Sequence, residues 1–220
     1  MNKKLGLFLL PALLWAQSDD VRRINEAAAV LTEVMGISDK AIPQELLDKA
    51  ECAVVVPGLK KGAFIIGGKY GRGFLSCRTS GIGWSAPGAV RVEGGSIGLQ
   101  IGGSETDVIM LVMNKRGAEK LLSSKFTVGG DASVAAGPVG RSSTAETDAF
   151  MRAEILSWSR SRGAFAGVAL QGATLRQDLD VNKRLYGREV TNKELAGGKV
   201  GTPEGAAPLI SALNKYSSRK

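Results

Sequence analysis

The sequence predicts a single α+β domain: a mostly antiparallel, glycine-rich β-sheet, curved enough to be barrel-like, flanked by N-terminal and C-terminal helices. About half of the 29 glycines lie between residues 58 and 103, threaded through β-branched and aromatic residues. A flexible linker would be polar, so this stretch indicates strands whose backbone comes close to other strands or to a bound molecule. Amphipathic helical patterns precede and follow it, and no polar linker divides the chain.

Helices are expected where a capping residue precedes an apolar pattern with a period of 3.6 residues. Ser18, Asn114 and Asp178 stand at three such starts, and Gly36 and Gly187 stand at two ends. Two further patterns begin with a proline in the first turn. Together these signals predict helices over residues 18–35, 43–50, 114–123, 178–186 and 202–216.

Strands are expected in the glycine-rich part, where glycine pairs punctuate β-branched runs. Residues 57–58 are expected to stop the first strand, and residues 71–73, 94–95 and 162–163 to turn three hairpins. The predicted strands are 53–56, 63–70, 74–78, 90–93, 96–101, 107–113, 153–160 and 164–174, with short strands around 133–137. The segment 189–201 is polar and is expected to be mobile.

Residues 1–16 are expected to be a secretory signal peptide, because two lysines, an apolar run and Ala16 at a cleavage point follow one another in the order typical of such leaders. The apolar run is short for a membrane anchor, which is the alternative. The rest of the chain is expected to form a domain over residues 17–187 and a polar tail over 188–220 with a terminal amphipathic helix. The protein is therefore expected to be exported, and to be periplasmic or peripherally membrane-associated in a bacterium.

The composition excludes several kinds of chemistry. The chain has no histidine, which excludes Ser-His-Asp and Cys-His catalysis, histidine-ligated zinc and an imidazole proton shuttle. We therefore expect no enzyme activity, no metal and no cofactor. The net charge of +8 favours anionic partners, although an excess of this size also serves solubility. Export argues against nucleic acid as the partner.

The two cysteines, Cys52 and Cys77, are expected to form a disulfide. An even number of cysteines in an exported chain favours a bridge, and these two lie at the ends of a predicted three-strand meander. Closing a loop of about 25 residues stabilises a fold by roughly 3–4 kcal/mol in the chain-entropy model. A pair of buried free thiols is the alternative.

Basic residues gather near the predicted turns. Lys60 and Lys61 follow the Pro57-Gly58 pair, and Lys69 and Arg72 flank the tip of the next hairpin. If these tips project from one end of the sheet, they form a cationic rim in which each residue contributes about 1 kcal/mol near an anionic bilayer, screened over about 8 Å. These four are the predicted contacts to lipid headgroups; gatekeeping charges at sheet edges are the alternative.

Several motifs in a fixed order resemble the SYLF domain family. They lie within about residues 21–187 and read KGAFIIGGKYGRG (61–73), WSAP (84–87), GSIGLQIG (95–102), ASVAAGPVG (132–140) and SWSRSRG (157–163). The resemblance implies a non-enzymatic lipid-binding domain: eukaryotic members bind phosphoinositide membranes, and some yeast members bind and bundle actin.

These observations together predict binding of anionic phospholipid, such as phosphatidylglycerol or cardiolipin, at the surface of a bacterial envelope membrane. Tyr70 is a candidate for the membrane interface, and Trp84 is expected in the core. An envelope protein is the second expected partner, and actin is not expected in this compartment. The alternatives are a structural or protein-interaction module without lipid binding, and a carrier that holds an apolar ligand inside the sheet.

Overall fold

The computed structural model describes residues 18–37, 41–63, 66–80, 83–97, 102–139, 153–161, 164–166, 170 and 172–217. The predicted leader, residues 1–16, lies outside the described residues. The helices are α1 (Asp19–Gly36), α2 (Gln44–Lys49), α3 (Lys115–Leu121), α5 (Leu179–Tyr186), α6 (Asn192–Ala196) and α7 (Ala207–Tyr216), and a 3₁₀ turn, Glu204–Ala206, precedes α7. The strands are β1 (Cys52–Ala63), β2 (Ile66–Cys77), β3 (Gly88–Ile97), β4 (Gly102–Val112), β5 (Lys125–Thr127), β6 (Val134–Ala136), β7 (Ile155–Ser161), β8 (Ala164–Ala166) and β9 (Thr174–Gln177).

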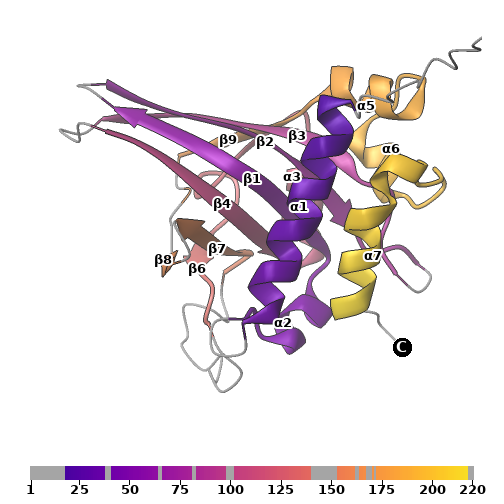
Figure 1. The fold of residues 1–220 in the computed structure, drawn as a ribbon, viewed down its shortest axis with the longest axis horizontal. Coiled ribbons are helices and arrows are strands. Elements are labelled where there is room, and N and C mark those ends of the chain that lie inside the picture. The colour runs from indigo at the N-terminus through magenta and orange to yellow at the C-terminus, as the bar shows by residue number, and fades with distance from the viewer. Residues whose placement is uncertain are drawn as a thin grey trace, which may run out of the picture.

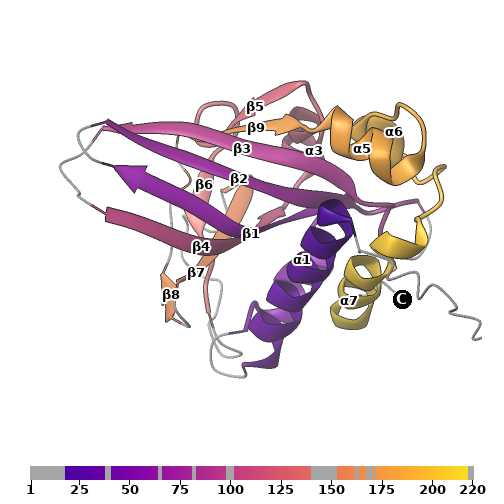
Figure 2. The same ribbon diagram turned by 45° about the horizontal axis from the view of Figure 1, so that its top comes forward.

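One strongly curved sheet organises the molecule, which confirms the predicted α+β class. In the described part of the chain the strand order is β5-β9-β3-β2-β1-β4-β7-β6, and β8 pairs with β7. All of these neighbouring strands pair antiparallel, except β6 and β7, which are parallel. The long strands β1 to β4 form the middle of the sheet, and one end of them extends well beyond the helices (Figures 1 and 2). This end of the four strands is called the projecting end below.

The sheet separates two hydrophobic cores, because successive side chains of a strand point to opposite faces. On one face, α1, α2 and α7 pack on residues such as Val55, Phe74 and Ile109. On the other face the sheet curls around a second core, which includes Val54 and Leu75. Helix α3 packs on this second core, and Figure 2 shows it on the side of the sheet opposite α1 and α7. Below, the face under α1, α2 and α7 is called the helix-covered face, and the opposite face, around which the sheet curls, is called the curled face.

The five predicted helices form, with ends within a few residues of the prediction. The side chains of Ser18, Asn114 and Asp178 each accept a backbone N–H bond from the first turn of their helix. Gly187 ends α5 in the left-handed conformation, with φ of 67°. These signals are local, since a cap satisfies backbone groups within one turn. Local sequence was therefore sufficient to place these five helices.

Three predicted strand boundaries are wrong. Pro57-Gly58 does not stop β1 but produces an irregular register, after which the strand continues to Ala63. Residues 71–73 do not turn a hairpin but lie inside β2, and residues 94–95 lie inside β3. Gly73 explains the difference, since a Cβ there would lie 2.2 Å from the Val55 carbonyl oxygen. The glycine permits close approach of β1 to β2 rather than reversal of the chain.

The last predicted hairpin forms only in part. Strand β8 pairs antiparallel with β7, as expected, and the predicted turn at 162–163 lies outside the described residues. However, the predicted strand 164–174 divides. Its end belongs to β9, which pairs with β3 and β5 at the other side of the sheet.

The segment 189–201 is ordered by packing, contrary to the prediction of a mobile tail. Thr191 and Glu194 form a capping box that starts α6. Leu195 is fully buried, and the buried Asn192 accepts a hydrogen bond from the Asn182 side-chain amide (2.8 Å) and donates one to the Ala89 carbonyl (3.0 Å). Tertiary hydrogen bonds therefore order a segment whose own sequence is polar.

The expected disulfide is present. Cys52 and Cys77 lie opposite each other in β1 and β2 and are joined at an S–S distance of 2.07 Å. The two residues close one hairpin of two long strands rather than a three-strand meander, because β2 is continuous. The bridge thus ties together the ends of β1 and β2 that are farthest from the projecting end.

Candidate functional site

Two lysines face each other at the projecting end of the sheet. Lys61 of β1 lies directly opposite Lys69 of β2, on the curled face. Among the described residues neither has a carboxylate oxygen within 4.0 Å, the limit for an ion pair, and the same is true of Lys60. Burial, and secondly the charge of Lys69, lowers the pKa of the Lys61 ammonium. The two lysines therefore form an unneutralised cationic pair.

The other two predicted headgroup contacts point to the helix-covered face. Lys60 lies opposite Tyr70 in β2 and opposite Glu105 in β4. Arg72 lies two residues farther along β2, and its Nε lies 3.4 Å from the nearly buried carboxylate of Asp178. The structure thus brings Lys61 and Lys69 together, separates them from Lys60 by the thickness of the sheet, and places Arg72 beside a carboxylate.

The two aromatic candidates lie in different environments. Tyr70, on the projecting part of β2, is 47% exposed. Trp84 is buried, as expected; its indole N–H donates to the carbonyl of Ser217 (3.1 Å), and the Arg78 guanidinium lies 3.9 Å from the ring centre. Only Tyr70 is therefore available to an external ligand.

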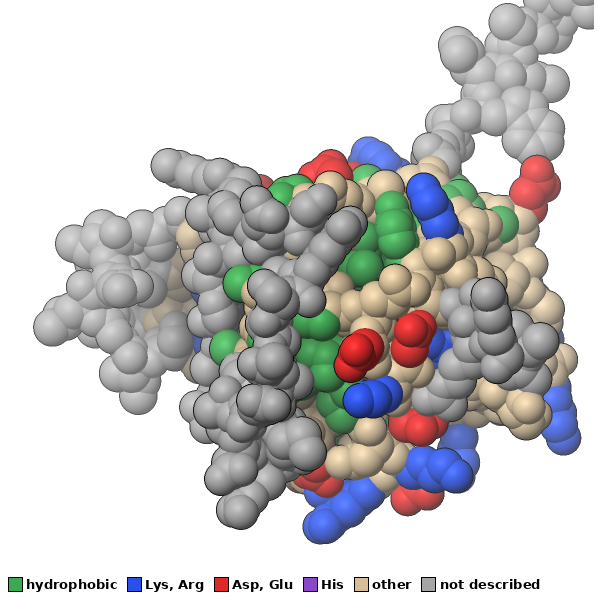
Figure 3. Space-filling view, turned by 90° about the horizontal axis from the view of Figure 1, so that it is seen from below, with side chains coloured by type: hydrophobic (Ala, Val, Ile, Leu, Met, Phe, Trp, Pro, Cys, Tyr) green, Lys and Arg blue, Asp and Glu red, His purple; other side chains and the backbone are tan. Residues whose placement is uncertain are grey.

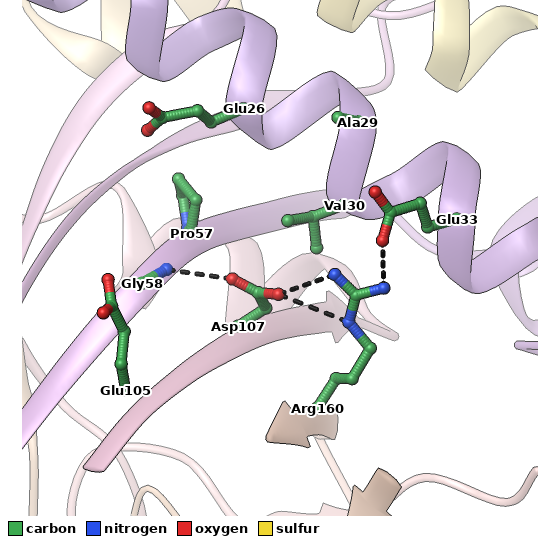
Figure 4. Close-up of a pocket in the computed structure, with 9 residues that line it drawn as sticks. All are labelled: Glu26, Ala29, Val30, Glu33, Pro57, Gly58, Glu105, Asp107 and Arg160. Carbon is green, nitrogen blue, oxygen red and sulfur yellow. Dashed lines mark hydrogen bonds and ion pairs between the residues drawn. The ribbon is translucent and has the colours of Figure 1, made fainter. Parts of the chain in front are cut away.

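A carboxylate-lined pocket of about 680 Å³ lies between α1 and the sheet (Figure 4). Arg160 of β7 crosses it, donating to Asp107 Oδ2 at 2.9 Å and to Glu33 of α1. Although burial opposes the effect, these two hydrogen bonds raise the pKa of Arg160. Asp107 Oδ1 also accepts the Gly58 N–H at 3.0 Å. The pocket is completed by Glu26, Ala29, Val30, Pro57 and Glu105.

Only part of this pocket is predictable from the sequence. The predicted strands 107–113 and 153–160 place Asp107 and Arg160 at strand ends, but nothing in the sequence connects them with Glu33. The connection requires the crossing of α1 over the sheet and the irregular register at Gly58, which turns that N–H toward Asp107. No local signal in the sequence gives either feature.

Other kinds of site are not apparent in the part of the chain that the structure describes. There, no group of three or more cysteine, aspartate or glutamate side chains is arranged to hold a metal ion. Within the same residues, no helix has both the length and the apolar character needed to cross a bilayer. On the described surface in Figure 3, acidic and basic side chains are interspersed around apolar ones. The projecting end of the sheet and the pocket of Figure 4 are two candidate sites.

The fold and these sites define an α+β half-barrel domain with a cationic strand end and an acidic pocket. The family model described as "Ysc84: Las17-binding protein actin regulator" matches residues 93–216. The chain belongs to this family, which confirms the resemblance to the SYLF domain.

Curated relatives match almost the whole chain. An SH3 domain-containing protein of Schizosaccharomyces pombe is 34% identical over 93% of this chain and 48% of its own length. Protein YSC84 of Saccharomyces cerevisiae is 30% identical, over 93% of this chain and 44% of its own. An SH3 domain-containing YSC84-like protein of Xenopus laevis is 29% identical, over 89% and 60%. The chain thus spans about half the length of these relatives.

Proposed function

We propose that the protein binds anionic phospholipid surfaces peripherally, through the projecting end of its sheet. The observation that carries this proposal is the opposed, unneutralised pair of Lys61 and Lys69. Like charges placed directly opposite each other destabilise a sheet. An external anion removes this repulsion, so the pair is better suited to a charged ligand than to the fold alone.

The position of the pair supports a surface ligand. The strands that carry it extend beyond the helices (Figure 1), so a flat membrane reaches them without contact with α1 or α7. Tyr70 adds an exposed amphipathic side chain beside Lys60, and such rings favour the headgroup region. Three lysines at about 1 kcal/mol each give weak binding that added salt screens.

The proposal extends to the place of action. The leader-like sequence of residues 1–16 supports export, and an exported domain would meet phosphatidylglycerol or cardiolipin at an envelope membrane of a bacterium. The expectation that actin is not a partner of this chain stays a prediction, since actin regulation is part of the family's description.

Co-sedimentation with vesicles tests the lipid proposal. We expect the protein to sediment with phosphatidylglycerol/cardiolipin vesicles at low salt, and not with phosphatidylcholine vesicles or at high salt. Lys61→Gln/Lys69→Gln should lower the bound fraction strongly. The matched control is Lys115→Gln/Lys193→Gln, which removes the same charge from two exposed lysines on α3 and α6. Equal loss in both double variants would show a net-charge effect and overturn the site.

A protein-interaction module is the second candidate function, and the pocket of Figure 4 favours it. Four of its side chains are carboxylates and one is a guanidinium, so it suits a basic side chain of a partner protein. Fluorescence anisotropy with a labelled oligo-arginine peptide tests this function. Tighter binding by the wild type than by Glu26→Gln, together with no sedimentation with any vesicle, would favour protein interaction over lipid binding.

A further inference from the structure

Four basic residues lie opposite one another across four neighbouring strands. Arg72 of β2 is opposite Arg91 of β3, Arg91 is opposite Arg176 of β9, and Arg176 is opposite Lys125 of the edge strand β5. Residues that face each other in antiparallel strands share one face of the sheet, so the four form a single line, here called the cation row. At a strand spacing of about 4.8 Å, the row is roughly 14 Å long.

The cation row is only partly neutralised. The Asp178 carboxylate lies 3.4 Å from Arg72 Nε, and Glu93 lies 3.8 Å from Arg91 and 3.6 Å from Arg176. Within the described residues, exposed Lys125 has no ion pair. Two carboxylates thus serve four cations placed directly opposite one another, which is an unfavourable arrangement for a sheet.

Unsatisfied polar atoms gather at the same place. Arg72 Nε, Arg91 Nε and Asp178 Oδ2 are buried and form no hydrogen bond among the described residues, although Arg72 Nε and Asp178 Oδ2 form an ion pair with each other. Buried polar atoms of native proteins are normally hydrogen-bonded, so Arg91 Nε, which lies 3.8 Å from Glu93, indicates a water or an ion that completes it. The three arginine side chains are nevertheless 36–43% exposed as a whole, so an external anion can reach them.

We propose that the cation row binds a short linear chain of phosphate groups. Arginine forks donate two parallel hydrogen bonds to phosphate oxygens, and three of them in line present donors along the length of one phosphate chain. Glu93 follows Arg91 by two residues in β3, and Asp178, directly after the end of the antiparallel β9, follows Arg176 by two. Carboxylates thus flank the row on both sides, which disfavours a broad anionic surface and leaves room for a ligand one chain wide.

This site is independent of the proposed membrane contact. The cation row lies on the face opposite Lys61 and Lys69, because Arg72 is three residues from Lys69 in a regular strand. Its other members come from β3, β9 and β5 rather than from the β1–β2 hairpin. A membrane contact and a phosphate-chain site can therefore be removed separately.

Isothermal titration calorimetry of the full chain with tripolyphosphate and orthophosphate, at constant ionic strength, tests the proposal. We expect tripolyphosphate to bind about tenfold more tightly or better, because it reaches several cations at once. Arg91→Gln/Arg176→Gln should abolish this preference, whereas Lys61→Gln/Lys69→Gln, with the same loss of charge, should retain it. Equal affinity for the two phosphates, or an unchanged preference in the arginine double variant, would overturn the proposal.

Three further measurements separate this site from other roles. The thermal midpoint of Arg91→Gln should equal or exceed that of the wild type, because the variant removes a like-charge contact; a clear decrease would show a structural role for the row instead. Tighter binding of a single-stranded oligonucleotide than of tripolyphosphate would replace the proposed ligand with nucleic acid. Loss of vesicle binding in the arginine variant, with tripolyphosphate affinity unchanged, would assign the row to the membrane.

Discussion

The two halves of strand β2 use glycine for opposite purposes. One half of β2 lies between the two cores and is called the covered half below. There, a Cβ on Gly73 would lie 2.2 Å from the Val55 carbonyl oxygen and 2.8 Å from the Val56 Cα. At the projecting end, a Cβ on Gly68 would meet no atom within 4 Å. Both glycines belong to one continuous strand. The glycine-rich motif therefore has one part that packing requires and another part that packing does not explain.

The projecting end carries a whole row of such glycines. Gly68 lies opposite Gly62 in β1 and Gly95 in β3, and Gly62 lies opposite Gly103 in β4. For Gly62, Gly68 and Gly95 there is open space where a Cβ would be. Glycine in a strand is unfavourable by about 0.5–1 kcal/mol relative to alanine. Alanine in place of these glycines is therefore expected to stabilise the projecting end, whereas the covered half has no room for a Cβ at Gly73.

The largest expected effect comes from adding one methyl group to the covered half. Gly73→Ala should lower the free energy of unfolding by more than about 4 kcal/mol, because the new Cβ overlaps backbone atoms that cannot rotate away. Urea denaturation followed by circular dichroism measures this change, and failure to obtain folded protein is the extreme form of the same result.

The matched variant at the projecting end is Gly68→Ala. We expect it to leave the free energy of unfolding unchanged or to raise it by up to about 1 kcal/mol, because the alanine has room and the unfolded chain loses entropy. Similar destabilisation by both variants would contradict the distinction between the two halves of β2.

The disulfide gives the next largest effect and belongs to the covered half. Replacing both Cys52 and Cys77 by alanine should lower the free energy of unfolding by about 2–4 kcal/mol, since the bridge closes a loop of some 25 residues in the unfolded chain. The urea midpoint of the double variant measures the loss. Under conditions in which the double variant is still folded, vesicle binding should persist, because the bridge lies far along the strands from Lys61 and Lys69. Loss of both properties together would show that the projecting end depends on the bridge.

The sequence predicted those parts of the fold that local interactions determine. Ser18, Asn114 and Asp178 cap helices with their own side chains, so each helix start could be found from a few residues. The amphipathic patterns and the cysteine pair were equally informative. Helix α6 was missed although the Thr191–Glu194 capping box is a local signal for its start; its packing on the sheet depends on Asn182 and Ala89, which lie elsewhere in the chain.

The candidate sites depend on register, which sequence determines poorly. Glycine is typical both of turns and of close strand contacts, and the clash at Gly73 with β1 is visible only after the strands are paired. For the same reason, the sequence did not reveal that Arg72 stands in line with Arg91 and Arg176. A shift of one residue would place these side chains on opposite faces.

The smallest expected effect is the pH dependence that the lysine pair adds at the projecting end. The pKa of Lys61 is lowered by burial and by Lys69, so the folded protein releases this proton before the unfolded chain does. Between the lowered pKa and the ordinary value of 10.5 the unfolded state binds more protons, and stability therefore rises with pH. Urea midpoints measured from pH 8 upward should show this rise in the wild type and a smaller one in Lys69→Gln, which removes the neighbouring charge. The control Lys115→Gln should retain the full rise. An identical pH profile in the wild type and Lys69→Gln would mean that the two ammonium groups do not interact, and would remove the electrostatic basis of the membrane proposal.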